Sequence, residues 1–205
     1  MRARTVAVTA ALLIASLTAC GSGDGDKPDS KPSAEGPAKQ EPNDDTGAGE
    51  PRKLGEPAQT IGDGGTGVLQ ITPDTVVYVK EDSGEKAANG IFAVVTMKDK
   101  AMTGVAADEV APISGGGWSW IAPDGETIGF DSGNSTMVTL DKYDGADPVQ
   151  PGSWQWRSQV FDLTPAQAKG GTLIYVDGEE AAHRWKMPAA DSGPNVAELK
   201  KQLAE

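Results

Sequence analysis

Four of the five tryptophans occur as two pairs, and the residues of each pair are two positions apart. Trp118 and Trp120 form the first pair, and Trp154 and Trp156 form the second. Because successive side chains of a β-strand point to opposite faces, both indoles of a pair project from the same face. Such pairs either fill a sandwich core or form an exposed platform on which sugar rings or peptides stack. The four tryptophans are therefore candidate binding residues as well as candidate core residues.

The residues around the second pair favour the core. One side of this segment carries Trp154, Trp156, Ser158 and Val160, and the other side carries Ser153, Gln155, Arg157 and Gln159. Large aromatic side chains contribute most to stability when buried, whereas arginine and glutamine are mostly exposed. The sequence therefore predicts that the tryptophans face inward. A ligand platform flanked by Gln155, Arg157 and Ser119 is the alternative.

A single histidine limits the catalytic chemistry of the chain. His183 is the only imidazole that could act as the base of a nucleophilic triad, with Ser119 or Ser158 as the nucleophile. The segment Gly117–Ile121 lacks the second glycine of a nucleophile elbow, and nothing around it resembles the strand-turn-helix of that motif. The sequence therefore predicts a partly buried structural histidine and no catalytic residues.

Acidic residues offer an alternative chemistry. Asp124, Glu126 and Asp131 could serve a cell-wall-active hydrolase of glycans or peptides, although carboxylates are common on any acidic surface. The acidic loop Asp141–Asp147 does not match the spacing of an EF-hand and is expected to be solvated. With one cysteine and one histidine, a Cys-based zinc site and a His-rich metal site are excluded. We expect no metal and no cofactor.

The composition excludes another class of function. The chain has 205 residues, with 18 Lys and Arg against 30 Asp and Glu, and a formal net charge of -12. Such an acidic chain repels the phosphate backbone of a nucleic acid, so we expect no nucleic-acid partner. One cysteine also means that no internal disulfide can form.

The first twenty residues have the pattern of an export signal. Arg2 and Arg4 precede the apolar run Val6–Leu17, which is too short to cross a bilayer as a helix. The run ends in Leu17-Thr18-Ala19-Cys20, which resembles the lipobox of bacterial lipoproteins. The resemblance implies a signal peptide over 1–19, fatty acylation of the Cys20 thiol, including palmitate, and anchoring at the extracytoplasmic face of the cell membrane. A plain secretory signal with an incidental cysteine is the alternative.

Composition divides the rest of the chain. Segment 20–59 is rich in Gly, Pro and charged residues with one large aliphatic, Leu54, and is expected to be a disordered acidic tether. All aromatic residues lie beyond residue 60, which places a folded domain at 60–191. A tail at 192–205 follows, in which 195–205 has the pattern of a short helix.

Short apolar segments separated by Gly, Pro, Asn and Asp breaks predict an all-β fold with an antiparallel sandwich. The expected strands are 68–79 with a bend or edge position at Pro73, 90–98, 118–121, 126–130, 136–140, 153–163, 172–177 and 181–187. Asp177-Gly178 is expected to be the turn between the last two. The run Ser114–Gly117 indicates either a flexible loop or a place of close approach, as for a bulge or a ligand.

Several of these segments resemble a known family. Gly62–Asp191 resembles the immunoglobulin-like domain of unknown function found in many Gram-positive lipoproteins, through Gly90–Lys98, Gly152–Leu163 and Thr172–Met187. The resemblance implies an immunoglobulin-like β-sandwich. Together with the anchoring signal, it leads us to expect a non-catalytic binding or interaction module on the membrane, with a cell-wall glycan or a protein as its partner.

Overall fold

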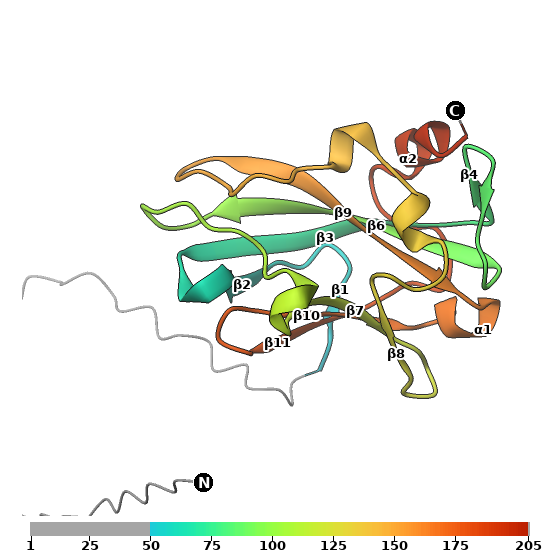
Figure 1. Ribbon diagram of the computed structural model, residues 1–205, viewed down its shortest axis with the longest axis horizontal. Coiled ribbons are helices and arrows are strands. Elements are labelled where there is room, and N and C mark those ends of the chain that lie inside the picture. The colour runs from blue at the N-terminus through green and yellow to red at the C-terminus, as the bar shows by residue number, and fades with distance from the viewer. Residues whose placement is uncertain (1–49, 205) are drawn as a thin grey trace, which may run out of the picture. The chain divides into compact units, whose positions relative to one another are not determined.

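Two sheets pack face to face in the computed structural model, which describes residues 50–204 (Figure 1). The five-stranded sheet has the order β1 (Arg52–Lys53), β11 (Ala182–Lys186), β10 (Thr172–Val176), β7 (Gly117–Ile121) and β8 (Thr127–Gly129). The four-stranded sheet has the order β2 (Ala58–Ile61), β3 (Val68–Val79), β6 (Ile91–Ala101) and β9 (Trp154–Leu163). A small hairpin joins β4 (Glu81–Asp82) and β5 (Glu85–Lys86).

Short helices lie in the connections and at the C-terminal end. They are the 3₁₀ turns η1 (Asp63–Gly65), η2 (Pro112–Ser114), η3 (Ser135–Met137) and η4 (Asp141–Tyr143), and the α-helices α1 (Pro165–Ala168) and α2 (Val196–Gln202). All pairings within the two sheets are antiparallel except that of β1 with β11, which is parallel. The expected all-β sandwich with a short C-terminal helix is therefore confirmed.

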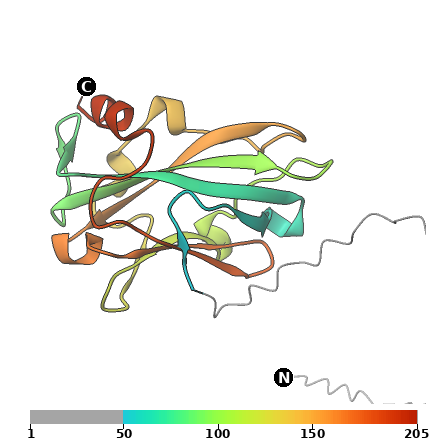
Figure 2. The same cartoon turned by 180° about the vertical axis from the view of Figure 1, so that it is seen from behind.

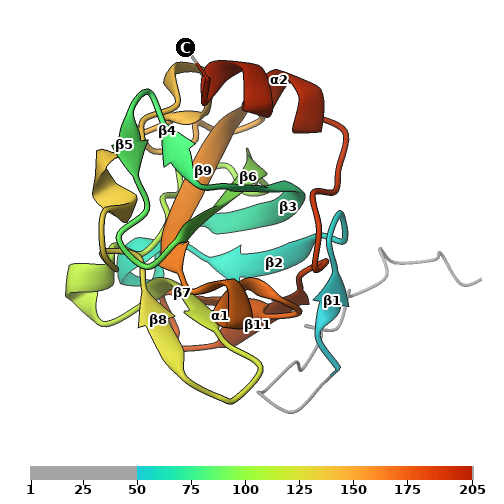
Figure 3. The ribbon, with the colours of Figure 1, turned by 90° about the vertical axis from the view of Figure 1, so that its right-hand side faces the viewer.

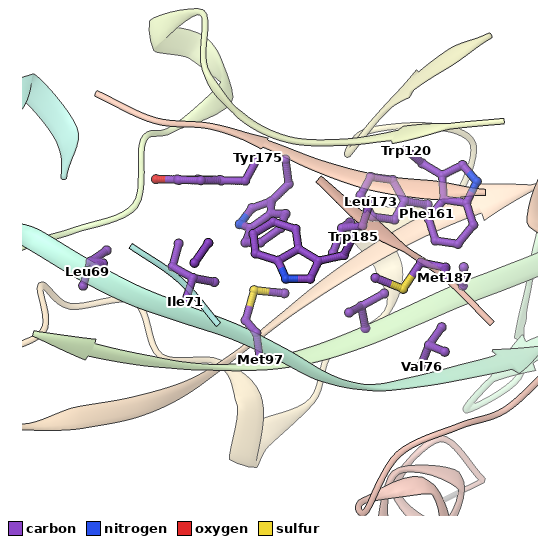
Figure 4. Close-up of a cluster of buried hydrophobic side chains, with 14 of the residues drawn as sticks. Leu69, Ile71, Val76, Met97, Trp120, Phe161, Leu173, Tyr175, Trp185 and Met187 are labelled. Atoms are coloured by element: carbon purple, nitrogen blue, oxygen red, sulfur yellow. The ribbon is translucent and has the colours of Figure 1, made fainter. Parts of the chain in front are cut away.

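The main core lies between the two sheets. Figure 4 shows its side chains pointing toward one another from both layers, with Leu69, Ile71, Val76 and Met97 on one side and Trp120, Leu173, Tyr175, Trp185 and Met187 on the other. Phe161 of β9 and Trp120 of β7 meet across the layers with ring centroids 5.8 Å apart. Burial of such large aromatic and aliphatic side chains is the main force that holds the two sheets together.

A second apolar cluster covers part of the outer face of the four-stranded sheet. Val77, Phe92 and Val94 project outward from β3 and β6 and are buried under residues in or next to η3, η4 and α2. The covering residues are Val138, Leu140, Tyr143, Leu199 and Leu203. Figure 3 shows α2 outside this sheet, on the side away from the other layer. Strand β6 is therefore buried on both faces, which explains its uninterrupted apolar run.

The expectation for Pro73 holds in one of its two forms, and another expected strand needs correction. The register of β3 with β6 shifts between Pro73 and Thr75, so the expected bend is present as a bulge. β3 itself is a central strand between β2 and β6, although its pairing with β2 covers only residues 68–71. The segment 136–140 is not a strand, because η3 occupies its start and its apolar residues Val138 and Leu140 pack on the second cluster instead of pairing.

The folded region begins before residue 60 and continues beyond 191. Strand β1 and part of β2 fall in the segment expected to be tether, and Leu54 packs against the main core. Helix α2 begins after Asn195, at the expected N-cap position. The signal peptide, Cys20 and the tether up to residue 49 lie outside the described residues. Within residues 50–204, no helix is long and apolar enough to cross a membrane.

Candidate binding face

The first tryptophan pair belongs to the core, as expected. Trp118 and Trp120 project from β7 between the sheets and are 2% and 0% exposed. The Trp118 indole N–H donates to Glu109 Oε2 at 2.9 Å, and the Trp120 indole N–H donates to the Gln167 carbonyl at 3.0 Å. A Cβ atom at Gly171 would overlap the Trp120 ring, so a glycine is needed there. With both rings enclosed, neither offers a face to a ligand.

The second pair faces the other way, which corrects the expected orientation. Trp154 is 49% exposed and Trp156 is half-buried, and Trp156 packs against the second cluster outside the sheet. The neighbours Arg157 and Phe161 point into the sandwich instead. The alternation along β9 therefore holds, but the side that carries the tryptophans is the outer one.

Arg157 shares the inner side of β9 with Phe161 and Leu163, which are buried in the main core. Its side chain is 10% exposed, and its guanidinium lies 3.3 Å from Asp99 Oδ2 and 2.6 Å from Asp108 Oδ1. Glu109 Oε2 lies 3.9 Å from it, and the Asp147 carbonyl accepts a further hydrogen bond at 2.9 Å. A buried cation is tolerated only when such partners surround it. We call Asp99, Asp108, Glu109 and Arg157 the arginine cluster.

Three carboxylates surround one guanidinium in the arginine cluster, and this imbalance affects their ionisation. Burial raises the pKa of Asp99 well above its usual range, and the nearby charge of Glu109 raises it further. Burial also raises the pKa of Glu109, although the Arg157 charge opposes the shift. A carboxyl group that is enclosed beside a second carboxyl group is stabilised in its protonated form. The cluster therefore favours the protonated forms of Asp99 and Glu109.

The outward side of β9 continues across the sheet as a mixed polar and aromatic surface. Strand register places Gln59, Gln70, Lys100 and Trp154 in one row, and Thr72, Lys98 and Trp156 in the next. Paired residues of neighbouring strands project from the same face of a sheet. We call these seven residues the Trp154 face. It lies toward the start of β9, at the end of the sheet away from α2 (Figures 1 and 2).

Aromatic and cationic contacts hold Trp154 in place. The Lys98 ammonium lies 4.0 Å from the centroid of the Trp154 ring, within range of a cation–π interaction. Trp156 meets Trp154 edge-on, with ring centroids 5.7 Å apart and planes at 86°. The buried Tyr143 in turn supports Trp156 at 5.6 Å. The exposed indole is therefore backed by a chain of rings that ends in the second cluster.

His183 is buried and contacts a carboxylate that holds a turn. It is buried on β11, and its Nε2 atom lies 3.0 Å from Asp177 Oδ2. Burial alone would raise the pKa of Asp177, but hydrogen bonds from the Ile61 backbone and from His183 outweigh it and lower that pKa. Asp177 also accepts from two backbone N–H groups of the expected hairpin turn. Among the described residues, no hydrogen bond joins His183 to a serine.

The other candidates occupy turns. Asp124 Oδ1 accepts from the Glu126 backbone at 3.1 Å, and Glu126 Oε2 accepts from Gln167 at 2.7 Å. These two carboxylates and Asp131 are exposed. In Ser114–Gly117, a Cβ atom at Gly117 would lie 2.7 Å from the Val110 carbonyl. The glycines thus permit close approach of the chain to itself.

Sequence reasoning missed two sets of residues. It did not identify Lys98 and Lys100 as neighbours of Trp154, although their spacing in a strand puts both on one face. It also missed the arginine cluster, whose members are far apart in the sequence. No group of three or more His, Cys, Asp or Glu residues within 50–204 is arranged to hold a metal ion.

The comparisons with known proteins give one structural likeness. No family model and no curated protein matches the sequence. Among solved structures, the chain is similar to ycdA of Bacillus subtilis strain 168, a protein whose description assigns it provisionally to the lipoproteins. The TM-score is 0.45 at 10% sequence identity, over 67% of this chain and 39% of that protein.

Proposed function

We propose that this chain is a lipid-anchored, extracytoplasmic interaction module without catalytic activity, and that its partner binds to the Trp154 face. The exposure of Trp154 is the observation that carries the proposal. Large aromatic side chains dominate the energetics of binding sites, and this one is held in a fixed orientation by Lys98 and Trp156. A rigid indole loses little entropy when a partner stacks on it.

The anchoring part of the proposal rests on the sequence. The lipobox resemblance at Leu17–Cys20 supports acylation of Cys20 and a position on the outer side of the cell membrane. Two acyl chains would make such an anchor stable. The immunoglobulin-like relationship belongs to the same proposal, supported by the β-sandwich and by the segments that resemble that family.

Co-sedimentation with purified Gram-positive cell-wall sacculi tests the binding function. We expect the wild-type chain to sediment with the walls and Trp154→Ala to stay in the supernatant. Phe130→Ala is the matched control, because Phe130 is an exposed aromatic residue outside the Trp154 face. Release of soluble wall fragments during the incubation would contradict the non-catalytic assignment. Equal sedimentation of wild type and Trp154→Ala would refute the assignment of the binding face.

Membrane fractionation tests the anchor. Cys20→Ala removes the thiol that would be acylated, so the variant should either persist as an unprocessed precursor or leave the membrane fraction. Cleavage before residue 20 and detergent extraction identical to those of the wild type would exclude lipid attachment at Cys20.

A further inference from the structure

Two lysines on the Trp154 face have no acidic partner in the part of the chain that the structure describes. Within residues 50–204, the ammonium groups of Lys98 and Lys100 form no salt bridge, whereas Lys142 lies 2.7 Å from Glu198. The chain has 30 acidic against 18 basic side chains, yet none of the seven residues of the Trp154 face is acidic. The face therefore presents positive charge on an acidic protein, and its charge is complementary to an anionic ligand.

Uncharged polar groups complete the surface. Gln59 and Gln70 each carry an amide that can donate and accept, and Thr72 carries a hydroxyl. Within residues 50–204, none of these three side chains forms a hydrogen bond. The row from Gln59 to Trp154 crosses four strands, so at about 4.8 Å per strand spacing it spans about 14 Å. This length suits a short oligosaccharide.

The indole determines the kind of ligand. The Lys98 ammonium lies over the Trp154 ring, and the residue is still 49% exposed, so part of the indole remains accessible to a ligand. An aromatic face packs well against the C–H groups of a sugar ring, while amide groups beside it bind the hydroxyls. A peptide strand would instead need free backbone groups at the edge of β9, and beside the tryptophans the Trp156 carbonyl already accepts a hydrogen bond from the Gly145 backbone at 3.2 Å.

We infer that the Trp154 face binds an acidic saccharide. The sugar ring stacks on Trp154, its carboxylate pairs with Lys100, and its hydroxyls reach Gln70 and Gln59. This inference rests on the proposed function, because it names the ligand class of the same surface. It adds a preference for a charged sugar over its neutral counterpart. An experiment can refute this preference even if the chain still binds cell walls through the Trp154 face.

Two monosaccharides form a matched pair of probes. N-acetylmuramic acid differs from N-acetylglucosamine by its lactyl ether, which bears the carboxylate. The detergent-solubilised full-length chain is titrated with each sugar by calorimetry. We expect N-acetylmuramic acid to bind about two- to fivefold more tightly, the effect of one exposed ion pair. This preference should weaken as salt is added.

Three variants separate the contributions of Lys100 and Trp154 to sugar binding. Lys100→Gln should abolish the preference and leave the affinity for N-acetylglucosamine unchanged. Trp154→Ala should abolish binding of both sugars. Lys169→Gln, at an exposed lysine outside the face, should behave like the wild type.

Other outcomes would overturn the inference. Equal affinity of the wild type for the two sugars would show that the ligand need not be acidic, although cell-wall binding could persist. Absence of binding to either sugar would exclude a saccharide. Tighter binding of an acidic tripeptide that depends on Lys100 would identify a peptide site. Dimerisation that is lost in Trp154→Ala, measured by light scattering, would identify a second copy of the chain as the partner.

Discussion

Strands β7 and β9 carry the same tryptophan spacing and place it on opposite sides of their sheets. In β7 both indoles are enclosed between the layers, whereas in β9 Trp154 is exposed and Trp156 is half-buried outside. The two strands differ in the side chains that alternate with their tryptophans. The inner side of β9 carries Arg157, whose partners lie inside the sandwich. Alternation thus defines which residues share a face, and we expect the ion cluster around Arg157, together with the core residues Phe161 and Leu163, to decide which face of β9 is inner.

Removal of an inner tryptophan should have the largest effect on stability. Trp120→Ala removes a fully buried indole that contacts Phe161 and hydrogen-bonds to a main-chain carbonyl. The free energy of unfolding should fall by about 3 to 5 kcal/mol. Urea denaturation followed by circular dichroism measures the change. A loss no greater than that of Trp154→Ala would show that β7 and β9 do not differ as described.

Removal of the buried cation tests what orients β9. Arg157→Met leaves Asp99 and Glu109 enclosed without their cation, and breaking a buried pair in this way costs about 3 kcal/mol or more. Lys100→Met on the neighbouring strand is the control and should change stability by less than about 0.5 kcal/mol, because Lys100 is exposed. Urea denaturation of both variants measures the two changes in the free energy of unfolding. Equal stability would mean that the arginine cluster does not determine the inner face.

The pH dependence of stability should report the same cluster. Because the pKa of Asp99 is higher in the folded than in the unfolded state, its contribution is fully present below the unfolded value and is lost as pH rises through the folded one. Asp177, whose pKa is lowered, stabilises the fold above the unfolded value, and this contribution is lost only as the pH falls into acid. Thermal melting between about pH 5 and about pH 8, above the ordinary carboxyl pKa, covers the range in which carboxyl groups with a raised pKa titrate, Asp99 and its neighbour Glu109 among them.

The comparison variant is Asp99→Asn. Its melting temperature should decline less steeply with rising pH than that of the wild type over this range, because the amide does not titrate. Parallel declines of the two proteins would exclude Asp99 as the titrating group.

Removal of the outer tryptophan should have the smallest effect on stability. Trp154→Ala loses contacts with Lys98 and Trp156 at the surface, so the free energy of unfolding should fall by less than about 1 kcal/mol. The emission removed by Trp154→Phe, obtained as a difference spectrum, should be that of a solvent-exposed indole. A blue-shifted difference spectrum would indicate that Trp154 is buried in solution.

The strands were largely predictable because each is a local pattern. The apolar run that forms β6 and the turn at Asp177-Gly178 are visible in a few consecutive residues. A capping box at Thr164 and Gln167, with proline between them, would also have indicated α1. The prediction of a strand at 136–140 is wrong because the apolar residues of this segment are buried by packing on the second cluster, which no local pattern reveals.

The candidate site was predictable only in part. Trp154 and Trp156 were singled out as a possible platform, but their orientation depends on Asp99, Asp108 and Glu109, which come from β6 and the loop after it. The remaining residues of the Trp154 face come from three other strands and meet only through the sheet register. Such a register links residues far apart in the sequence, and a single sequence does not specify it.

The parallel pairing of β1 with β11 constrains the order in which the fold can be completed. β1 is the first strand of the described chain, and its partner is the last, so the sheet edge stays open until nearly the whole domain is available (Figure 3). The cover of the second cluster arrives later still, because α2 follows β11. Contacts between such distant segments form slowly. A chain that emerges from its N-terminal end would therefore hold an incomplete sandwich until β11 and α2 have emerged, and an interruption near residue 180 would leave the part of the outer face that α2 covers open to aggregation.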